Sequence, residues 1–272
     1  RSISWSALER LSDAWAAALQ AMGVAAGDRI AVMLPNCPQF IICQFGAWKI
    51  GGIVSPLNPV YKETELLHAL KETGAEVAVV LTTCYETVQA IRKQTQLRHL
   101  VPVKIKTFLP LLKRLAFTLL REKKEGHAIE PEVSDPVFST LLKKYRQVQP
   151  EHYPLTPELP ALLMFTGGTT GQPKAALSTH RALYISASQI LAWFSPITAE
   201  WTDATLLLMP LFHTYGNIGA LGVGVLGKQV MVLVPDPRDI NALINTISQE
   251  KPAYLSGVPT LFVALENHPQ VK

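Results

Sequence analysis

The sequence predicts an α/β fold in which mostly parallel sheets are flanked by helices. Short apolar runs of strand length alternate with longer stretches in which apolar residues recur at helical spacing. This alternation of strand and helix is typical of a parallel sheet. The chain has 272 residues, of which 48% are hydrophobic and 17% charged. That balance allows a large buried core and excludes a disordered polyelectrolyte.

The chain opens with a predicted amphipathic helix. Ser6 and Glu9 have the spacing of a capping box, and apolar residues recur at helical spacing until Gly23 ends the pattern. Three short apolar runs of strand length follow in the first half, each ended by a turn or helix signal. They are 30–34, 53–57 and 77–81. A second helical pattern runs through Phe40, Phe45 and Trp48, and a third over 63–70 stops at Gly74.

The same alternation resumes in the second half, where four more strands are expected. They are 162–165, 206–209, 230–234 and 253–255. The intervening segment is charged, interrupted by prolines and without strand signals, so it is expected to be a surface insertion or linker. The predicted divisions are a first α/β subdomain (1–103), the insertion (104–157) and a second α/β subdomain that carries a glycine-rich loop and is truncated at its C-terminus (158–272).

Cysteine usage and hydropathy favour a cytoplasmic protein. Cys37, Cys43 and Cys84 form no CxxC pair and stand near no histidine cluster, so they are interpreted as buried hydrophobes in a reducing compartment, with no metal site predicted. The most apolar stretch, 218–234, is interrupted by Lys228 and Gln229, and no membrane span is expected. The first residue is Arg1 rather than Met, so the natural N-terminus is expected to lie upstream.

The net charge of +4 is concentrated in one segment. Residues 101–125 hold seven Lys or Arg against two Glu, whereas a nucleic-acid-binding protein would spread basic and aromatic residues over a groove, so no nucleic-acid partner is expected. From Pro110, the segment predicts a helix with Leu112, Leu115 and Leu119 on one face. Two interpretations stay open: a helix packed on its own domain, or a peripheral contact with anionic lipid on the inner face of the membrane. The basic residues on the other face are Lys113, Arg114, Arg121 and Lys124, with Phe117 among them.

The run Thr166–Lys174 combines residue types that bind polyphosphates. Its glycines let backbone N–H groups approach anionic oxygens, its threonines add hydroxyl donors, and Lys174 supplies a movable positive charge. It is not a Walker loop, because Gln172 stands five places after Gly167. A flexible connection is the alternative interpretation of such a run. The candidate phosphate-binding residues are Thr166, Gly167, Gly168, Thr169, Thr170, Gly171 and Lys174.

This run, with Ser178–Arg181 after it, resembles the signature of the adenylate-forming superfamily, which includes acyl-CoA synthetases, luciferases and peptide-synthetase adenylation domains. The resemblance extends over essentially the whole chain, through Leu34–Asn36, Pro210–His213 and Gly257–Thr260. Within the superfamily the chain most resembles bacterial long-chain fatty acyl-CoA ligases. The resemblance implies the large N-terminal domain of such an enzyme, with ATP, Mg²⁺ and coenzyme A as reactants or cofactors.

In such enzymes a carboxylate attacks the α-phosphate of ATP, and the thiol of CoA then displaces AMP from the acyl-adenylate. The resemblance implies that Lys174 balances the charge of the leaving pyrophosphate and that His213 orients the reacting acid. It also assigns Asn217 and Gly257 to the site of a fatty acid or other carboxylic acid. Asn217 stands where some long-chain members carry an aromatic gate, so that type of gate is not expected. Ala175 replaces a usual glycine, which implies about 1 kcal/mol of strain if its φ is positive.

Three motifs that the superfamily uses are absent from the sequence: a Tyr-Gly-x-Thr-Glu run for the metal-linked glutamate, a Thr-Gly-Asp for the ribose, and a small C-terminal domain with its catalytic lysine. The chain is therefore interpreted as a fragment of an acid–thiol ligase that is inactive alone. The alternatives are an aryl-CoA ligase, a peptide-synthetase adenylation domain, or a non-catalytic nucleotide-binding domain.

Overall fold

The computed structural model describes residues 2–166, 172–194 and 199–271, which form two compact units. The first unit comprises the described residues of Arg1–Leu34 and Pro38–His180, and the second those of Pro35–Cys37 and Arg181–Lys272. This division differs from the predicted boundaries at 103/104 and 157/158. The reason is that the strand after residue 158 pairs with a strand of the first half, Val54 opposite Leu162, and so joins its sheet.

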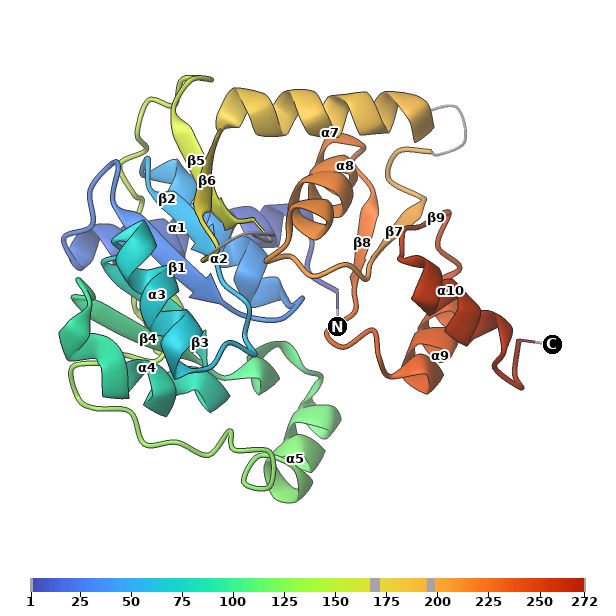
Figure 1. The fold of residues 1–272 in the computed structure, drawn as a ribbon, viewed down its shortest axis with the longest axis horizontal. Helices are drawn as coiled ribbons and strands as arrows, with labels where there is room; N and C mark the ends of the chain where they lie inside the picture. Colours follow the sequence, from blue (N-terminus) through green and yellow to red (C-terminus); the bar gives the residue numbers. More distant parts are fainter. Residues whose placement is uncertain (1, 167–171, 195–198, 272) are drawn as a thin grey trace. The chain divides into compact units, whose positions relative to one another are not determined.

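The first unit is built on a six-stranded sheet of order β4-β3-β1-β2-β5-β6 (Figure 1). All neighbouring pairs are parallel except β5 and β6, which are antiparallel, so the expected mostly parallel α/β fold is confirmed. Two strands, β4 and β6, were not expected from the sequence. The strands are β1 (Arg29–Met33), β2 (Ile53–Pro56), β3 (Val77–Leu81), β4 (His99–Val103), β5 (Pro160–Phe165) and β6 (Ala175–Thr179).

Helices cover both faces of this sheet (Figure 1). Alternate strand residues point to opposite faces: Met33 and Val80 pack with Leu66 of α3 (Glu63–Thr73) and Val88 of α4 (Tyr85–Ile91) in one core. On the opposite face, α1 (Trp5–Ala21) packs closely against α2 (Pro38–Lys49), since a Cβ on Gly46 would lie 2.6 Å from Trp15 Cδ1.

Two helix ends test the predicted caps. The N-cap of α1 is Ser4, whose Oγ accepts from the Ala7 amide at 3.2 Å, so the capping box predicted at Ser6 and Glu9 is wrong by two residues. The box fails because Ser6 already lies inside the first turn. At the other helix, Gly74 ends α3 in the left-handed conformation, φ 59°, as predicted.

The segment 104–157 is only in part a surface connection. It contains η3 (Ile105–Phe108), α5 (Leu111–Leu120) and α6 (Phe138–Lys144). The side chains of α5 are largely exposed, but Phe138 of α6 is buried, with its ring centroid 5.0 Å from that of Trp15. Asp135 just before α6 is buried too and pairs with Arg92. The part near α6 therefore belongs to the core of the first unit.

The second unit holds a three-stranded parallel sheet of order β8-β7-β9. Its core is formed by Leu206, Leu208, Val234 and Leu243. Among the described residues, no helix is long and apolar enough to cross a membrane. The elements of the second unit are α7 (His180–Phe194) from Arg181 on, β7 (Ala204–Leu207), a π-helix (Tyr215–Gly222), α8 (Val223–Leu226), β8 (Val230–Leu233), α9 (Ile240–Glu250), β9 (Tyr254–Leu255) and α10 (Pro259–Glu266).

Candidate functional site

The glycine-rich loop connects two antiparallel neighbours in the sheet, β5 and β6. Phe165 and Ala175 are register partners, and the Thr166 amide donates to the Lys174 carbonyl at 3.1 Å. The Thr166 hydroxyl donates to the same oxygen at 3.4 Å. The two ends of the loop are thus held side by side. The other predicted phosphate-binding residues, Gly167, Gly168, Thr169, Thr170 and Gly171, lie outside the described residues.

Lys174 stands at the exit of this loop with an exposed side chain. In the part of the chain that the structure describes, no ion pair is found for its ammonium. Ala175 begins β6 and is not among the described non-glycine residues with positive φ, which are Trp201, Lys228 and Lys251. The strain considered for Ala175 is therefore absent.

His180, in the run after the loop, has a packing role. Its ring makes an edge contact with Trp48 of α2, with the two centroids 5.3 Å apart, and the Trp48 indole donates to the Ala161 carbonyl of β5 at 2.8 Å. Burial lowers the pKa of His180 below its usual value, so the ring is neutral near pH 7. These contacts fix the base of the hairpin that carries the loop.

In the second unit, Asn36 secures the turn that leads to His213. Its side-chain amide donates to the Leu207 and Met209 carbonyls at 2.9 and 3.0 Å, and its oxygen accepts from the Leu211 amide at 2.8 Å. Asn36 is buried, and these bonds use both ends of its amide. In the sequence, Asn36 stood out only as part of a Pro-Asn turn signal and of the family resemblance, so this positioning role was missed.

His213 lies just beyond that turn and is exposed. Its Nδ1 accepts a hydrogen bond from the Tyr215 amide at 3.3 Å, so in the neutral tautomer Nε2 carries the hydrogen. The π-helix Tyr215–Gly222 follows at once, and π-helical turns are frequent at functional sites. The arrangement suits an orienting hydrogen-bond donor.

The structure places Asn217 in a structural contact. Its side chain is buried and donates to the Leu211 carbonyl at 2.9 Å. Gly216 beside it admits no side chain, because a Cβ would lie 2.1 Å from the Pro210 carbonyl oxygen. Gly257 stands between β9 and α10, where a Cβ would come within 3.1 Å of Leu261. These positions shape the backbone around the predicted acid site; none of them supplies a charged group.

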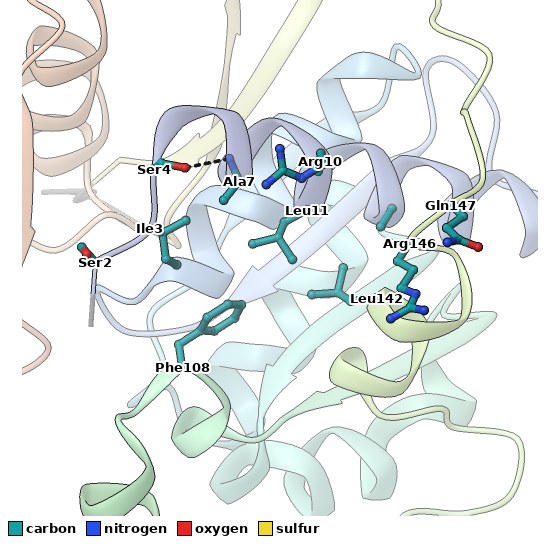
Figure 2. Close-up of a pocket in the computed structure, with 11 residues that line it drawn as sticks. Ser2, Ile3, Ser4, Ala7, Arg10, Leu11, Phe108, Leu142, Arg146 and Gln147 are labelled. Atoms are coloured by element: carbon teal, nitrogen blue, oxygen red, sulfur yellow. Dashed lines mark hydrogen bonds between the residues drawn. The ribbon is translucent and has the colours of Figure 1, made fainter.

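Two of the cavities lined by described residues lie in the first unit. One, of about 730 Å³, is lined by apolar side chains of α1, η3 and α6, with Arg10 and Arg146 also on its wall (Figure 2). No predicted site residue lines it. The other, of about 180 Å³, lies beside the loop and is bounded by His68 and Phe165 together with Gln172 and Pro173. Of these two, the second adjoins the candidate phosphate site.

The comparisons with known proteins agree with this geometry. The family model described as "AMP-binding enzyme" matches residues 1–272. The chain belongs to the AMP-binding enzyme family. A long-chain-fatty-acid–CoA ligase of Bacillus subtilis (strain 168) is 31% identical to this AMP-binding chain over 268 residues, covering 94% of the chain and 46% of the relative. The chain thus spans about half the length of the curated relatives it matches.

Solved structures show that this AMP-binding chain has the fold of the large N-terminal part of such enzymes. The anthranilate CoA ligase AuaEII, solved with anthranoyl-AMP, superposes with a TM-score of 0.82 at 22% identity over 100% of this chain and 48% of that one. A long-chain-fatty-acid-CoA ligase, FadD1 from Archaeoglobus fulgidus, gives 0.79 at 22% identity, over 98% and 47%. The predicted fold class and superfamily are confirmed.

Proposed function

We propose that this chain is the ATP-handling part of an acyl-CoA synthetase that activates a long-chain fatty acid through an acyl-adenylate. The observation that carries the proposal is the Gly/Thr/Lys loop, whose ends are closed by β5 and β6 and whose lysine is exposed and unpaired among the described residues. Backbone N–H groups of such a loop suit the β and γ phosphates. The chain-length assignment rests on the similarity to long-chain-fatty-acid–CoA ligases.

In this mechanism the protein positions reactants and neutralises charge. Lys174 would stabilise the negative charge that develops on the leaving pyrophosphate. His213 would donate from Nε2 to an oxygen of the acid and orient it toward the α-phosphate. CoA would then replace AMP on the acyl carbon.

Mg²⁺ normally accompanies ATP and neutralises its phosphates. In the described ranges, no group of three or more His, Cys, Asp or Glu side chains could hold a metal ion. The sequence also lacks the Tyr-Gly-x-Thr-Glu run. Among the described residues we therefore assign no protein ligand to the ion.

The test is acid-dependent release of pyrophosphate by the full-length enzyme. Palmitate-like acids are expected to drive release, and release should be much slower with benzoate-like acids or amino acids. Faster turnover of an aromatic acid would assign the chain to an aryl-CoA ligase, and preference for an amino acid would assign it to peptide-synthetase adenylation. ATP binding without release of pyrophosphate with any acid would indicate a non-catalytic nucleotide-binding domain.

The 272-residue chain alone is expected to unfold cooperatively in urea and to release no pyrophosphate from ATP and palmitate. The first expectation follows from the extensive buried core, and the second from the absent glutamate, aspartate and lysine motifs. Circular dichroism measures the unfolding, and a coupled assay measures the release of pyrophosphate. Clear turnover by the purified chain would show that the catalytic groups have been assigned wrongly.

We further propose that α5 makes a peripheral contact with anionic membrane. Five of its leucines are exposed: Leu111 (61%), Leu112 (80%), Leu115 (52%), Leu119 (82%) and Leu120 (73%). The helix is attached to its own unit by other side chains. The Phe117 ring lies 5.4 Å from that of His127, and Lys106 Nζ donates to the Thr118 hydroxyl at 3.0 Å. The leucine face therefore does not serve packing within the unit.

The charges around this leucine face support an anionic lipid surface as its partner. The exposed cations Lys113, Arg114 and Arg121 lie on the same helix or at its end. Burial lowers the pKa of His127, so this ring adds no charge near pH 7. An exposed apolar stripe flanked by cations suits the headgroup boundary of anionic lipid, where each Lys or Arg contributes about 1 kcal/mol.

Sedimentation with vesicles of phosphatidylserine and phosphatidylcholine tests this contact. Binding is expected to weaken as salt is raised and to fall by about 3 kcal/mol or more when Lys113, Arg114 and Arg121 are changed to Glu. Changing Leu112, Leu115 and Leu119 to Ser should abolish binding as well. A matched control changes Lys71, Lys93 and Lys143 to Glu, with the same change in net charge. Equal sedimentation of the wild type and the α5 variants would rule the contact out.

A further inference from the structure

His68 of α3 contacts both ends of the phosphate loop. Its Nε2 lies 2.8 Å from the carbonyl oxygen of Pro173, the residue before Lys174. Its ring makes an edge contact with Phe165, the residue before Thr166, with the centroids 6.3 Å apart and the planes at 62°. The hydrogen bond joins residues 105 positions apart, so only the fold brings them together.

The chemistry of the bond with Pro173 fixes both partners. A proline carbonyl can only accept, so His68 Nε2 must carry the hydrogen. The Pro173 carbonyl belongs to the same planar peptide unit as the Lys174 nitrogen. Holding that carbonyl therefore sets the direction in which the Lys174 backbone leaves the loop.

Among the residues that the structure describes, few other interactions hold this end of the loop. Gln172, Pro173 and Lys174 are exposed, so apolar burial contributes little there. The described contacts are the His68 bond and the two bonds from Thr166 to the Lys174 carbonyl. The small cavity of about 180 Å³ under Pro173 leaves room for the chain to shift if His68 is removed.

We propose that His68 is a positioning residue for the phosphate loop, which sets the orientation of Lys174 toward ATP. This rests on the proposed function. Loss of the bond in His68→Ala is expected to raise the KM for ATP about tenfold, the effect of about one hydrogen bond, while the KM for the fatty acid and the Tm change little. His68→Gln should restore most of the ATP affinity, because its amide nitrogen can donate from a similar place.

The experiment measures pyrophosphate release by full-length wild type, His68→Ala and His68→Gln, with ATP and acid varied separately. His152→Ala is the matched control. It also removes a histidine with one hydrogen-bond partner, because His152 Nε2 lies 3.2 Å from Asp13 Oδ1, and neither residue belongs to the loop. A second readout is hydrogen exchange without substrates. His68→Ala should speed exchange of the Thr166 amide, which donates to Lys174, and leave α3 protected.

Each outcome decides between the roles. The positioning role would be overturned if the KM for ATP were equal in wild type and His68→Ala. It would also be overturned if the KM for ATP rose equally in His68→Ala and His68→Gln. Increases in the KM for both substrates together with a lowered Tm would show general destabilisation instead. If wild type releases no pyrophosphate, the proposed function fails, and the exchange of the Thr166 amide still decides whether His68 holds the loop.

Discussion

Replacing Lys174 with Ala in the full-length enzyme is expected to slow adenylate formation by about ten- to a thousandfold, the usual effect of losing one preorganised charge stabiliser. The side chain is exposed, and no described group pairs with it, so the substitution removes a charge without disturbing a packed contact. The measurement is acid-dependent exchange of pyrophosphate into ATP. Stability should be unchanged, because surface substitutions usually alter it by less than about 0.5 kcal/mol.

Lys93→Ala is the matched control for this variant. Lys93 is also an exposed lysine of the first unit without a described partner, but it lies in the turn after α4. Its removal should leave the exchange rate unaltered. Lys174→Arg should retain part of the activity, since it keeps the charge and changes the geometry. Full activity of folded Lys174→Ala would remove the lysine from the mechanism.

Asp135→Ala is expected to lower the free energy of unfolding by about 3–5 kcal/mol, the cost of breaking a buried ion pair on one side. The Asp135 carboxylate is fully buried and accepts from Arg92 Nη1 and from the Tyr85 hydroxyl, both at 2.8 Å. Burial raises the pKa of Tyr85, and the nearby carboxylate of Asp135 raises it further. The Tyr85 hydroxyl therefore stays protonated and needs a hydrogen-bond acceptor. Urea denaturation with an unchanged slope measures the loss.

Two further variants define the source of that loss. Asp135→Asn keeps an acceptor for Tyr85 and removes the charge opposite Arg92, so its stability should fall between those of the wild type and Asp135→Ala. Glu130→Ala removes an exposed carboxylate nearby and should change the free energy of unfolding by less than about 0.5 kcal/mol. A loss below 1 kcal/mol in Asp135→Ala would mean that the segment before α6 does not stabilise the core.

Much of the fold was predictable because its strands are short apolar runs with clear ends. The strands missed were those in which local composition was weak. β4 contains Pro102, which is uncommon within a sheet, and β6 reads Ala-Ala-Leu-Ser-Thr beside a glycine loop. Both strands form because a neighbouring strand provides backbone hydrogen bonds: β3 pairs with β4, and β5 pairs with β6. The burial of Phe138 was missed for the same reason: it depends on Trp15, far away in the sequence.

The candidate site was predictable only where chemistry is local in the sequence. The loop and Lys174 were identified from nine consecutive residues, and the family assignment is confirmed. The roles of the individual loop residues stay predictions. His68 and Asn36 gave no comparable signal, because each acts through bonds to backbone carbonyls more than 100 residues away. Only the folded chain shows which carbonyls those are.

The hairpin of β5 and β6 affects how this protein can diversify. Strand pairing holds Phe165 opposite Ala175 whatever lies between them, so the sheet itself brings the ends of the connection together. Lengthening such a connection is inexpensive: each doubling costs about 0.6 kcal/mol in closure entropy. Insertions and substitutions within the connection would therefore leave the stability of the sheet nearly unchanged. The binding of a polyanion can then evolve separately from folding.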